Sequence, residues 1–401
     1  MPAHDRHPDT AAVHAGRLVV PSNVASSPPL FQASSYEFSD LDDVEAIYGG
    51  ARSGKIYGRY GGPNGEQFEA AIVELEGAEA AVGAAAGMSA IDAALATNLG
   101  PGDAIVATRE VYGGTYALLE HDYRSRGTGV RYVDQHDHAA VAAALAAAPA
   151  RVLYVEALTN PLVRVADIEA LATLAHEAGA ILVVDATFVT PALVRPLALG
   201  ADLVLHSVGK YLGGHGDVGA GVIAGSAELV ERARAYLIRR GATMPHFEAW
   251  LATRGLRTLG LRMERHSTNA VAVAAALGAH PAVAHVSHPS RADHPQHALA
   301  ARVYPRGMGG IVAFDLAGGA AAVDPFLRGL ETIAIVHSLG EVATTISYPT
   351  VSSHRPLLPA EREALGITRA TLRISCGIEH PGDIVADLAR ALGGLGERTR
   401  A

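Results

Sequence analysis

The 401-residue sequence contains a single cysteine, Cys376, and few aromatic or charged residues. One cysteine excludes an internal disulfide framework and is typical of a protein that works in a reducing compartment. Aromatic residues make up 5% and charged residues 18% of the chain, whereas hydrophobic residues reach 49%. This balance excludes a disordered chain and indicates a globular protein with a sizeable core.

Excess positive charge is also missing, because the formal net charge is −9. This charge argues against binding to nucleic acid or to an anionic membrane, so any basic site must be local. The alanine-rich run AAVAAALAAAPA is too short to span a bilayer, and the polar N-terminal stretch MPAHDRHPDT lacks the apolar core of a signal peptide. We therefore expect a cytoplasmic protein with a small-molecule substrate, no nucleic acid and no membrane partner.

Helical and strand-like patterns alternate from residue 63 onward. Apolar runs such as DAIVAT, RVLYVEAL, ILVVDAT and ADLVLHS are separated by helical segments, one of which has Asp167 as a plausible N-cap and Gly179 beyond its C-terminus. The alternation predicts an α/β fold with a mostly parallel sheet covered on both faces. After Gly241 a long helical stretch leads into a smaller α/β unit. We predict an N-terminal arm at 1–62, a large domain at 63–250 and a small C-terminal domain at 251–401.

Lys210 stands between the apolar run ADLVL and a glycine-rich segment, in LHSVGKYLGGHGDVGAG. The strongly hydrated amine of a lysine is rarely placed at the end of a buried strand unless its chemistry is used there. A lysine in an apolar pocket has a lowered pKa and can condense with an aldehyde as a Schiff base. Pyridoxal phosphate (PLP) is the obvious aldehyde cofactor, and it would also need a carboxylate for its ring nitrogen, phosphate donors and a stacking side chain.

Each of these further groups has a candidate. Asp185 ends the strand-like run ILVVD, although a helix cap or turn would explain it equally well. The segment AAAGMSA opens a helix whose free N–H groups suit a phosphate, although helix packing alone would also explain its glycine. Ser207 could donate to the same phosphate, and Tyr112 in VYGGT could stack on the ring. Each signal is weak, and their joint order along one chain carries the prediction.

Three other kinds of site are disfavoured. GHGDVG matches a dinucleotide-binding pattern, but the strand-like run AGVIAG follows it where a helix is required. No G-x-S-x-G is present to indicate a serine hydrolase. The segment HVSHPSRADHPQH has zinc-like spacing without cysteine or a carboxylate cluster, so we predict no metal and expect surface loop histidines at His285, His288, His294 and His297.

Motifs along nearly the whole chain resemble the Cys/Met-metabolism PLP enzymes, the family of the cystathionine synthases and lyases. The motifs are TAAVHAG, PPLFQASSYEF, YGR, AGMSA, VYGGTY, EALTNPL, VVDATF, HSVGKYLGGHGDV, SLGEVAT and LRISCGIE. The resemblance implies an aspartate-aminotransferase-like fold (PLP fold type I) and a homotetramer built from dimers that complete each other's active sites.

The resemblance also implies residue roles. Lys210 would carry the cofactor and move protons, and Tyr112 would stack on the ring and protonate the departing sulfur. Asp185 would hold the ring nitrogen, and Asn160 would lie near the ring's phenolic oxygen and the substrate. Further cofactor-binding residues would be Gly87, Met88, Thr187 and Ser207, with Tyr57 and Arg59 reaching the phosphate of a neighbouring subunit. Arg373, helped by Ser338, would bind the substrate carboxylate.

Four positions depart from the family pattern. Gly209 stands where Ser-x-Thr-Lys has its threonine, Ala186 replaces the usual asparagine, and YGR is followed by YGGPN. These changes leave the cofactor role intact but would weaken the binding of the cofactor. Ala343 stands where the SLG motif often carries a selective residue, so it bears on substrate choice.

The expected reaction is elimination or replacement at the γ-carbon of a sulfur amino acid, with cystathionine γ-lyase activity ranked first. Cystathionine γ-synthase, β-lyase and γ-substitution on a non-standard substrate remain alternatives. Methionine γ-lyase is ranked lower, because YGGTY lacks the cysteine that those enzymes tend to carry. The other hypotheses are a PLP-binding protein without turnover and an aminotransferase.

Overall fold

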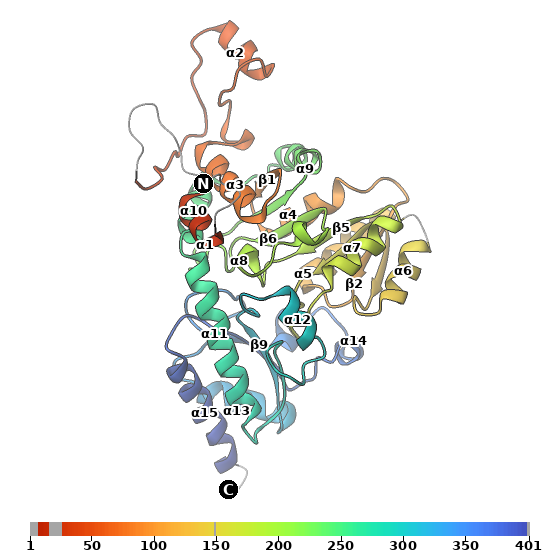
Figure 1. Ribbon diagram of the computed structural model, residues 1–401, viewed down its shortest axis with the longest axis vertical. Coiled ribbons are helices and arrows are strands. Elements are labelled where there is room, and N and C mark those ends of the chain that lie inside the picture. The colour runs from red at the N-terminus through yellow and green to blue at the C-terminus, as the bar shows by residue number, and fades with distance from the viewer. Residues whose placement is uncertain (1–6, 16–25, 148–149, 399–401) are drawn as a thin grey trace.

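The computed structural model describes residues 7–15, 26–147 and 150–398. Within these residues the chain forms a seven-stranded sheet and a five-stranded sheet (Figure 1). The larger sheet has the order β1-β7-β6-β5-β4-β2-β3, in which β7 alone runs antiparallel to its neighbours. The predicted mostly parallel sheet is therefore confirmed. Its strands are β1 (Ala80–Ala84), β2 (Ala104–Thr108), β3 (Gly129–Val133), β4 (Ala150–Glu156), β5 (Ile181–Asp185), β6 (Leu203–Ser207) and β7 (Gly221–Gly225).

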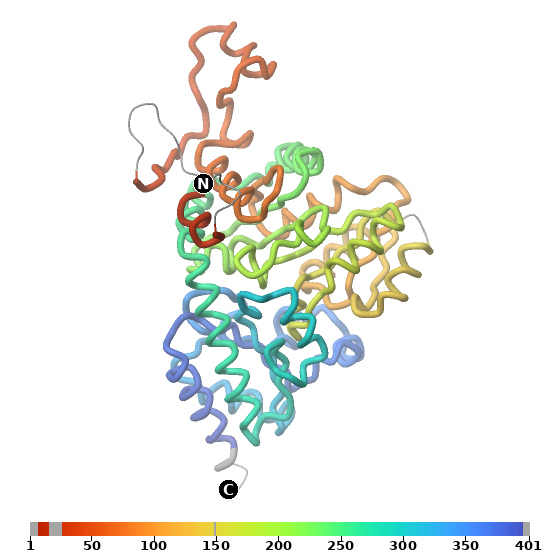
Figure 2. Tube along the Cα trace, in the orientation of Figure 1, coloured from red at the N-terminus to blue at the C-terminus, as the bar shows by residue number. Residues whose placement is uncertain are grey.

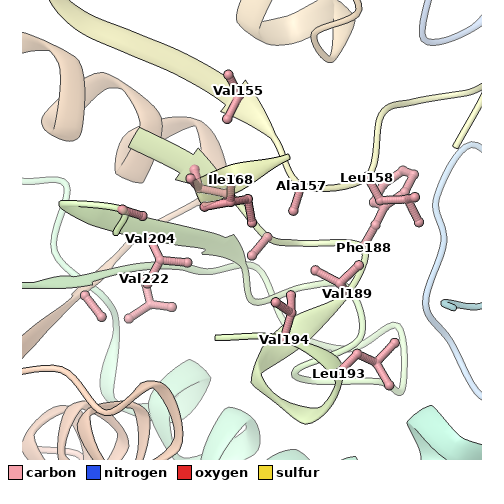
Figure 3. Packing of buried hydrophobic residues seen from close by; sticks show 14 of the residues in the cluster. Val155, Ala157, Leu158, Ile168, Phe188, Val189, Leu193, Val194, Val204 and Val222 are labelled. Atoms are coloured by element: carbon pink, nitrogen blue, oxygen red, sulfur yellow. The ribbon is translucent and has the colours of Figure 1, made fainter. Parts of the chain in front are cut away.

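Helices cover both faces of this sheet because its strands are apolar on both sides. On β4, Leu153 and Val155 pack into the core beneath α3 (Pro63–Glu76) and α7 (Ile168–Glu177). Val152 and Tyr154 alternate with them and pack beneath α4 (Gly87–Ala96) and α9 (Ala227–Arg240). Figure 3 shows part of the first core, with Val204 and Val222 on strands of the sheet. The other helices around this sheet are α5 (Gly113–Ala117), α6 (His138–Ala146), α8 (Thr190–Leu193) and α10 (His246–Leu256).

The five-stranded sheet lies in the C-terminal part of the chain, on a third apolar core. Its order is β10-β11-β12-β9-β8, and only β10 and β11 pair in parallel. The strands are β8 (Val283–Ser287), β9 (Ile311–Leu316), β10 (Ala334–Ile335), β11 (Thr345–Ser347) and β12 (Thr371–Ser375). The helices are α11 (Leu259–Gly278), α12 (His297–Val303), α13 (Val323–Gly329), α14 (Pro359–Ala364) and α15 (Pro381–Arg398). The predicted domain boundaries themselves stay a prediction.

The N-terminal region is less irregular than expected, because it contains α1 (Pro8–His14) and α2 (Leu41–Tyr48). Asp40 caps α2 by accepting the N–H of Asp43 at 2.8 Å, an interaction that stabilises even a short helix. The segment that carries α2 reaches away from the rest of the chain (Figure 2). It leaves Leu41 83% and Tyr48 61% exposed, which is unusual for large apolar side chains.

Two other sequence expectations need correction. The long helical stretch after Gly241 is divided into α10 and α11 at Thr258, which leaves the helical backbone conformation. The buried Arg262 donates to the Gly255 carbonyl oxygen at 2.7 Å and so satisfies the end of α10. The histidines of the 285–297 segment are not all at the surface. His288 and His294 are buried, and burial lowers the pKa of each to about 4, so both are neutral.

In the described part of the chain, no helix combines the length and hydropathy that crossing a membrane would require. GHGDVG is followed by β7, as the argument against a dinucleotide site anticipated.

Candidate active site

A cavity of about 480 Å³ opens at the carboxyl ends of β4, β5 and β6, where α/β sheets bind their ligands. Its walls also include residues from the C-terminal part of the chain, so both sheets contribute to it. Most of the predicted site residues line this cavity: Gly87, Met88, Tyr112, Asn160, Asp185, Thr187, Ser207, Lys210, Ser338 and Arg373.

One end of the cavity is suited to a phosphate. Helix α4 begins there at Gly87, and Ala86 before it has no side chain that could accept from the first-turn N–H groups. A Cβ added at Gly87 would lie 2.9 Å from the Ser207 hydroxyl oxygen, so glycine is required for this close approach. Unpaired N–H groups and the positive end of the helix dipole attract an anion. Ser207 in turn is held by a 2.9 Å bond from its N–H to the Thr187 hydroxyl.

Lys210 follows β6 in a tight turn and projects into the same cavity. Its Nζ donates to the hydroxyl oxygen of Ser338 at 2.8 Å. Burial lowers the pKa of the Lys210 amine, and the positive charge of Arg373 lowers it further, against a smaller opposing effect of Glu341. A lowered pKa raises the fraction of neutral amine, which is the nucleophilic form.

Asp185 is the last residue of β5 and faces the cavity. One of its oxygens accepts the Thr187 N–H at 2.9 Å, and the other accepts the Tyr154 hydroxyl at 3.3 Å. Burial raises the pKa of the Asp185 carboxyl, although the bonds from Thr187 oppose the shift. A positively charged ligand atom beside this carboxylate would favour its ionised form.

Arg373 lies on β12 and is only 4% exposed. It donates to the Asn160 side-chain oxygen at 2.8 Å and to the Ser338 carbonyl oxygen at 3.1 Å, while its Nε has no partner. Burial lowers the pKa of Arg373 to about 10, yet the group stays charged at neutral pH. Its partners in the described part of the chain are an amide oxygen and a carbonyl oxygen, not a carboxylate, so its positive charge is available to a ligand carboxylate.

The charges of the cavity fit PLP. A helix end suited to an anion, an amine of lowered pKa and a half-buried carboxylate match its phosphate, aldehyde and ring nitrogen in turn. Arg373 adds a further positive charge to the cavity, which is suited to a ligand carboxylate.

The sequence reasoning missed Glu156, a buried residue that also lines the cavity. It is the last residue of β4, and the argument from strand ends that singled out Asp185 would have found it. His337, Ser352 and Ser353 were missed as well, because their loops carry no periodic signal.

Tyr57 and Arg59 do not line the cavity. Both are exposed, and the Arg59 guanidinium lies over the rings of Tyr57 and Tyr60 and donates to the Ile238 carbonyl oxygen at 3.1 Å. Their contribution to a neighbouring subunit stays a prediction.

Three of the four departures have a clear structural setting. A Cβ at Gly209 would collide with the Val218 carbonyl oxygen, so the missing hydroxyl follows from the close approach of two backbone segments. Ala186 is buried in the core beneath α3 and α7, whereas the cavity opens on the other face. Ala343 is exposed and does not line the cavity.

Comparison with known proteins agrees with this geometry. A sequence model of the Cys/Met metabolism PLP-dependent enzymes matches residues 9–393. The O-succinylhomoserine sulfhydrylase of Pseudomonas aeruginosa is 40% identical over 387 residues, covering 96% of this chain and 95% of that protein. The L-methionine γ-lyase of Pseudomonas putida is 38% identical over 385 residues, covering 96% of each. A crystal structure of cystathionine γ-synthase from Xanthomonas oryzae pv. oryzae, with aminoacrylate and cysteine, aligns with a TM-score of 0.92 and 36% identity over 98% of this chain and 99% of that one.

Proposed function

The chain belongs to the Cys/Met metabolism PLP-dependent enzymes and has their type I fold, and on this premise we propose that it acts at the γ-carbon of a sulfur amino acid. Elimination from cystathionine, as a cystathionine γ-lyase, is the first assignment. The observation that carries the proposal is that an amine of lowered pKa, a phenol and an unpaired guanidinium, from Lys210, Tyr112 and Arg373, line one cavity. Removal of a proton, protonation of sulfur and binding of a carboxylate need these three groups.

Bound PLP supplies an electron sink for the negative charge that develops beside the α-carbon of the substrate. Arg373 binds the α-carboxylate, with Asn160 and Ser338 fixing the guanidinium plane. Lys210 accepts the α-proton on its neutral amine and carries protons between the α- and β-carbons. Tyr112 donates a proton to the departing sulfur.

The phosphate would be held by the first-turn N–H groups at Gly87 and Met88 and by the Ser207 hydroxyl. Asp185 would hold the ring nitrogen, and Thr187 orients that carboxylate through its N–H. The donors and acceptors that line the cavity support these assignments.

A replacement reaction is the second candidate, because one relative that is 40% identical to this chain is named an O-succinylhomoserine sulfhydrylase. Incubation with cystathionine, homocysteine, methionine, and an O-acyl homoserine plus cysteine separates the candidates. From cystathionine we expect cysteine, 2-oxobutanoate and ammonia. Cystathionine formed from the O-acyl homoserine would assign replacement, pyruvate would assign β-elimination, and retention of the amino group on the protein-bound cofactor would assign an aminotransferase. Absence of product from every amino acid would contradict the proposal.

We further propose that the protein is a cytoplasmic homotetramer of dimers with shared active sites. The exposed Tyr57 and Arg59, and the exposed apolar side chains on the segment that carries α2, are what a second copy could cover. The single cysteine, Cys376, is buried and unpaired, as suits a reducing compartment.

The shared site predicts complementation between inactive variants. Co-refolding Arg59→Ala with Lys210→Ala should restore about a quarter of the wild-type activity, since random pairing gives mixed dimers in half of all cases, each with one intact site. Co-refolding Lys210→Ala with Asp185→Ala is the matched control. These two residues line the same cavity of one chain, so no mixed dimer gains an intact site. Failure of the first pair to regain activity would contradict the shared site.

A further inference from the structure

A buried and a half-buried carboxylate lie side by side at the floor of the cavity, and the proposed function uses only one of them. Glu156 ends β4 and Asp185 ends β5, and the two are paired in the parallel register of these strands. Residues paired in this way face the same side of a sheet, and neighbouring strands are about 4.8 Å apart. Glu156 is 4% exposed and its side chain lines the cavity, so its burial requires a reason.

Each oxygen of Glu156 accepts a hydrogen bond from a different backbone segment. Oε1 accepts the N–H of Tyr112 at 2.5 Å, and Oε2 accepts the N–H of Asn160 at 3.2 Å. Tyr112 lies between β2 and α5, whereas Asn160 follows β4. The carboxylate therefore joins the segment of the stacking tyrosine to the segment that carries the partner of Arg373.

Only a carboxylate suits this position. Both N–H groups donate, so the side chain must present an acceptor to each of them. A glutamine would accept from one and place its own NH₂ against the other. Burial and the charge of Asp185 raise the pKa of Glu156, while the two N–H bonds oppose the shift. The two donors and a positively charged ligand ring beside Asp185 both favour the ionised form.

A second carboxylate ties the same two segments further from the cavity. Glu110 accepts the Thr159 hydroxyl at 2.7 Å and forms an ion pair with Arg164. Glu110 and Thr159 do not line the cavity, and they stand close in sequence to Tyr112 and Asn160. The bonds of Glu110 hold the two segments together even when those of Glu156 are lost, so a variant at Glu156 is expected to fold.

We propose that Glu156 is a positioning residue for the substrate-carboxylate site, holding Tyr112 and Asn160 in register and, through Asn160, the guanidinium of Arg373. The inference rests on the proposed function for the roles of Tyr112 and Arg373. It adds a residue that touches neither the reacting atoms nor the substrate carboxylate but fixes the groups that do.

The test is Glu156→Gln in the PLP-loaded enzyme, with glycine as the probe because it carries the α-carboxylate and no side chain. Calorimetric titration should give a Kd for glycine raised about tenfold, the effect expected for loss of one hydrogen bond to a charged group. PLP content per chain should stay at the wild-type level, since the bonds at Gly87, Ser207 and Asp185 are untouched. KM for the sulfur substrate should rise in parallel.

Asp387→Asn is the matched control. Asp387 is also 4% exposed and accepts backbone N–H bonds from Glu331, Thr332 and Ile333, but it is not part of the cavity. We expect it to lower Tm and to leave the Kd for glycine unchanged. The same pattern in Glu156→Gln, a lower Tm with wild-type Kd and KM, would overturn the proposal.

A double-mutant cycle tests the route through Asn160. In an Asn160→Ala background the link to Arg373 is already lost, so Glu156→Gln should add less than its tenfold effect on the Kd for glycine. A full tenfold effect in that background would overturn the positioning role. If the wild-type enzyme binds glycine but releases no product from any sulfur amino acid, the proposed function fails, and the Kd comparison still decides the role of Glu156.

Discussion

Lys210→Ala is expected to abolish the covalent link to PLP and to lower kcat by about 10³-fold or more, since the roles proposed for the residue are those of anchor and proton carrier. Its neutral amine is favoured by burial and by the charge of Arg373, and no other lysine lines the cavity. The measurement is borohydride reduction followed by peptide mapping. Wild-type protein should carry a pyridoxyl label on the Lys210 peptide, and the variant should carry none.

The labelled peptide can be assigned without ambiguity, because Lys55 is the only other lysine in the sequence. Lys55 forms an ion pair with Glu66 outside the cavity. A Lys55→Arg variant should therefore keep the label and the visible absorption of the bound cofactor. A labelled peptide or a wild-type visible band in Lys210→Ala would contradict the assignment.

Arg373→Ala is expected to raise KM for α-carboxylate substrates about 100-fold, because a bidentate pair of charge-assisted hydrogen bonds is lost from a desolvated site. PLP content should change little, since Arg373 bonds to Asn160 and Ser338 and lies apart from the phosphate-binding end. Steady-state kinetics and cofactor titration together separate the two effects.

Two further variants check the Arg373 prediction. Arg373→Lys keeps the positive charge but loses the planar guanidinium that donates two parallel N–H bonds to a carboxylate. Its KM should therefore lie between those of the wild type and the alanine variant. Arg369→Ala removes an exposed arginine near the start of the same strand and should leave KM unchanged. Equal losses of substrate and cofactor affinity in Arg373→Ala would show that the residue serves the fold of the cavity instead.

Sequence patterns alone pointed to those candidate residues of the cavity that stand at the end of a single strand. Asp185 and Lys210 follow apolar runs, and the end of a buried parallel strand is where polar chemistry meets a ligand. Arg373 has no such local signal, because it stands within a buried strand of the second sheet and reaches the cavity only through the packing of the two parts. Its assignment came from the family motif alone.

The same limit applies to the fold. The strand β1 was missed because Ala80–Ala84 consists of small residues with weak strand preference, and it is ordered by pairing with β7. The burial of His288 and His294 could not be foreseen either, since it depends on how their loop packs against distant segments. Tertiary packing determines whether such residues form a strand or become buried, and a local sequence pattern carries no information about that packing.

The close approach of Gly209 and the Val218 carbonyl oxygen couples two segments of the chain in the substitutions they can accept. A side chain at position 209 would collide with the carbonyl oxygen of Val218, nine residues further along the chain, so a threonine is not accommodated there while this backbone keeps its path. A threonine at position 209 is thus expected to be tolerated only together with a change in the backbone near Val218, so the two substitutions should show epistasis. Saturation mutagenesis of position 209 alone should therefore select glycine, and only a library that varies both segments can place a hydroxyl at this position.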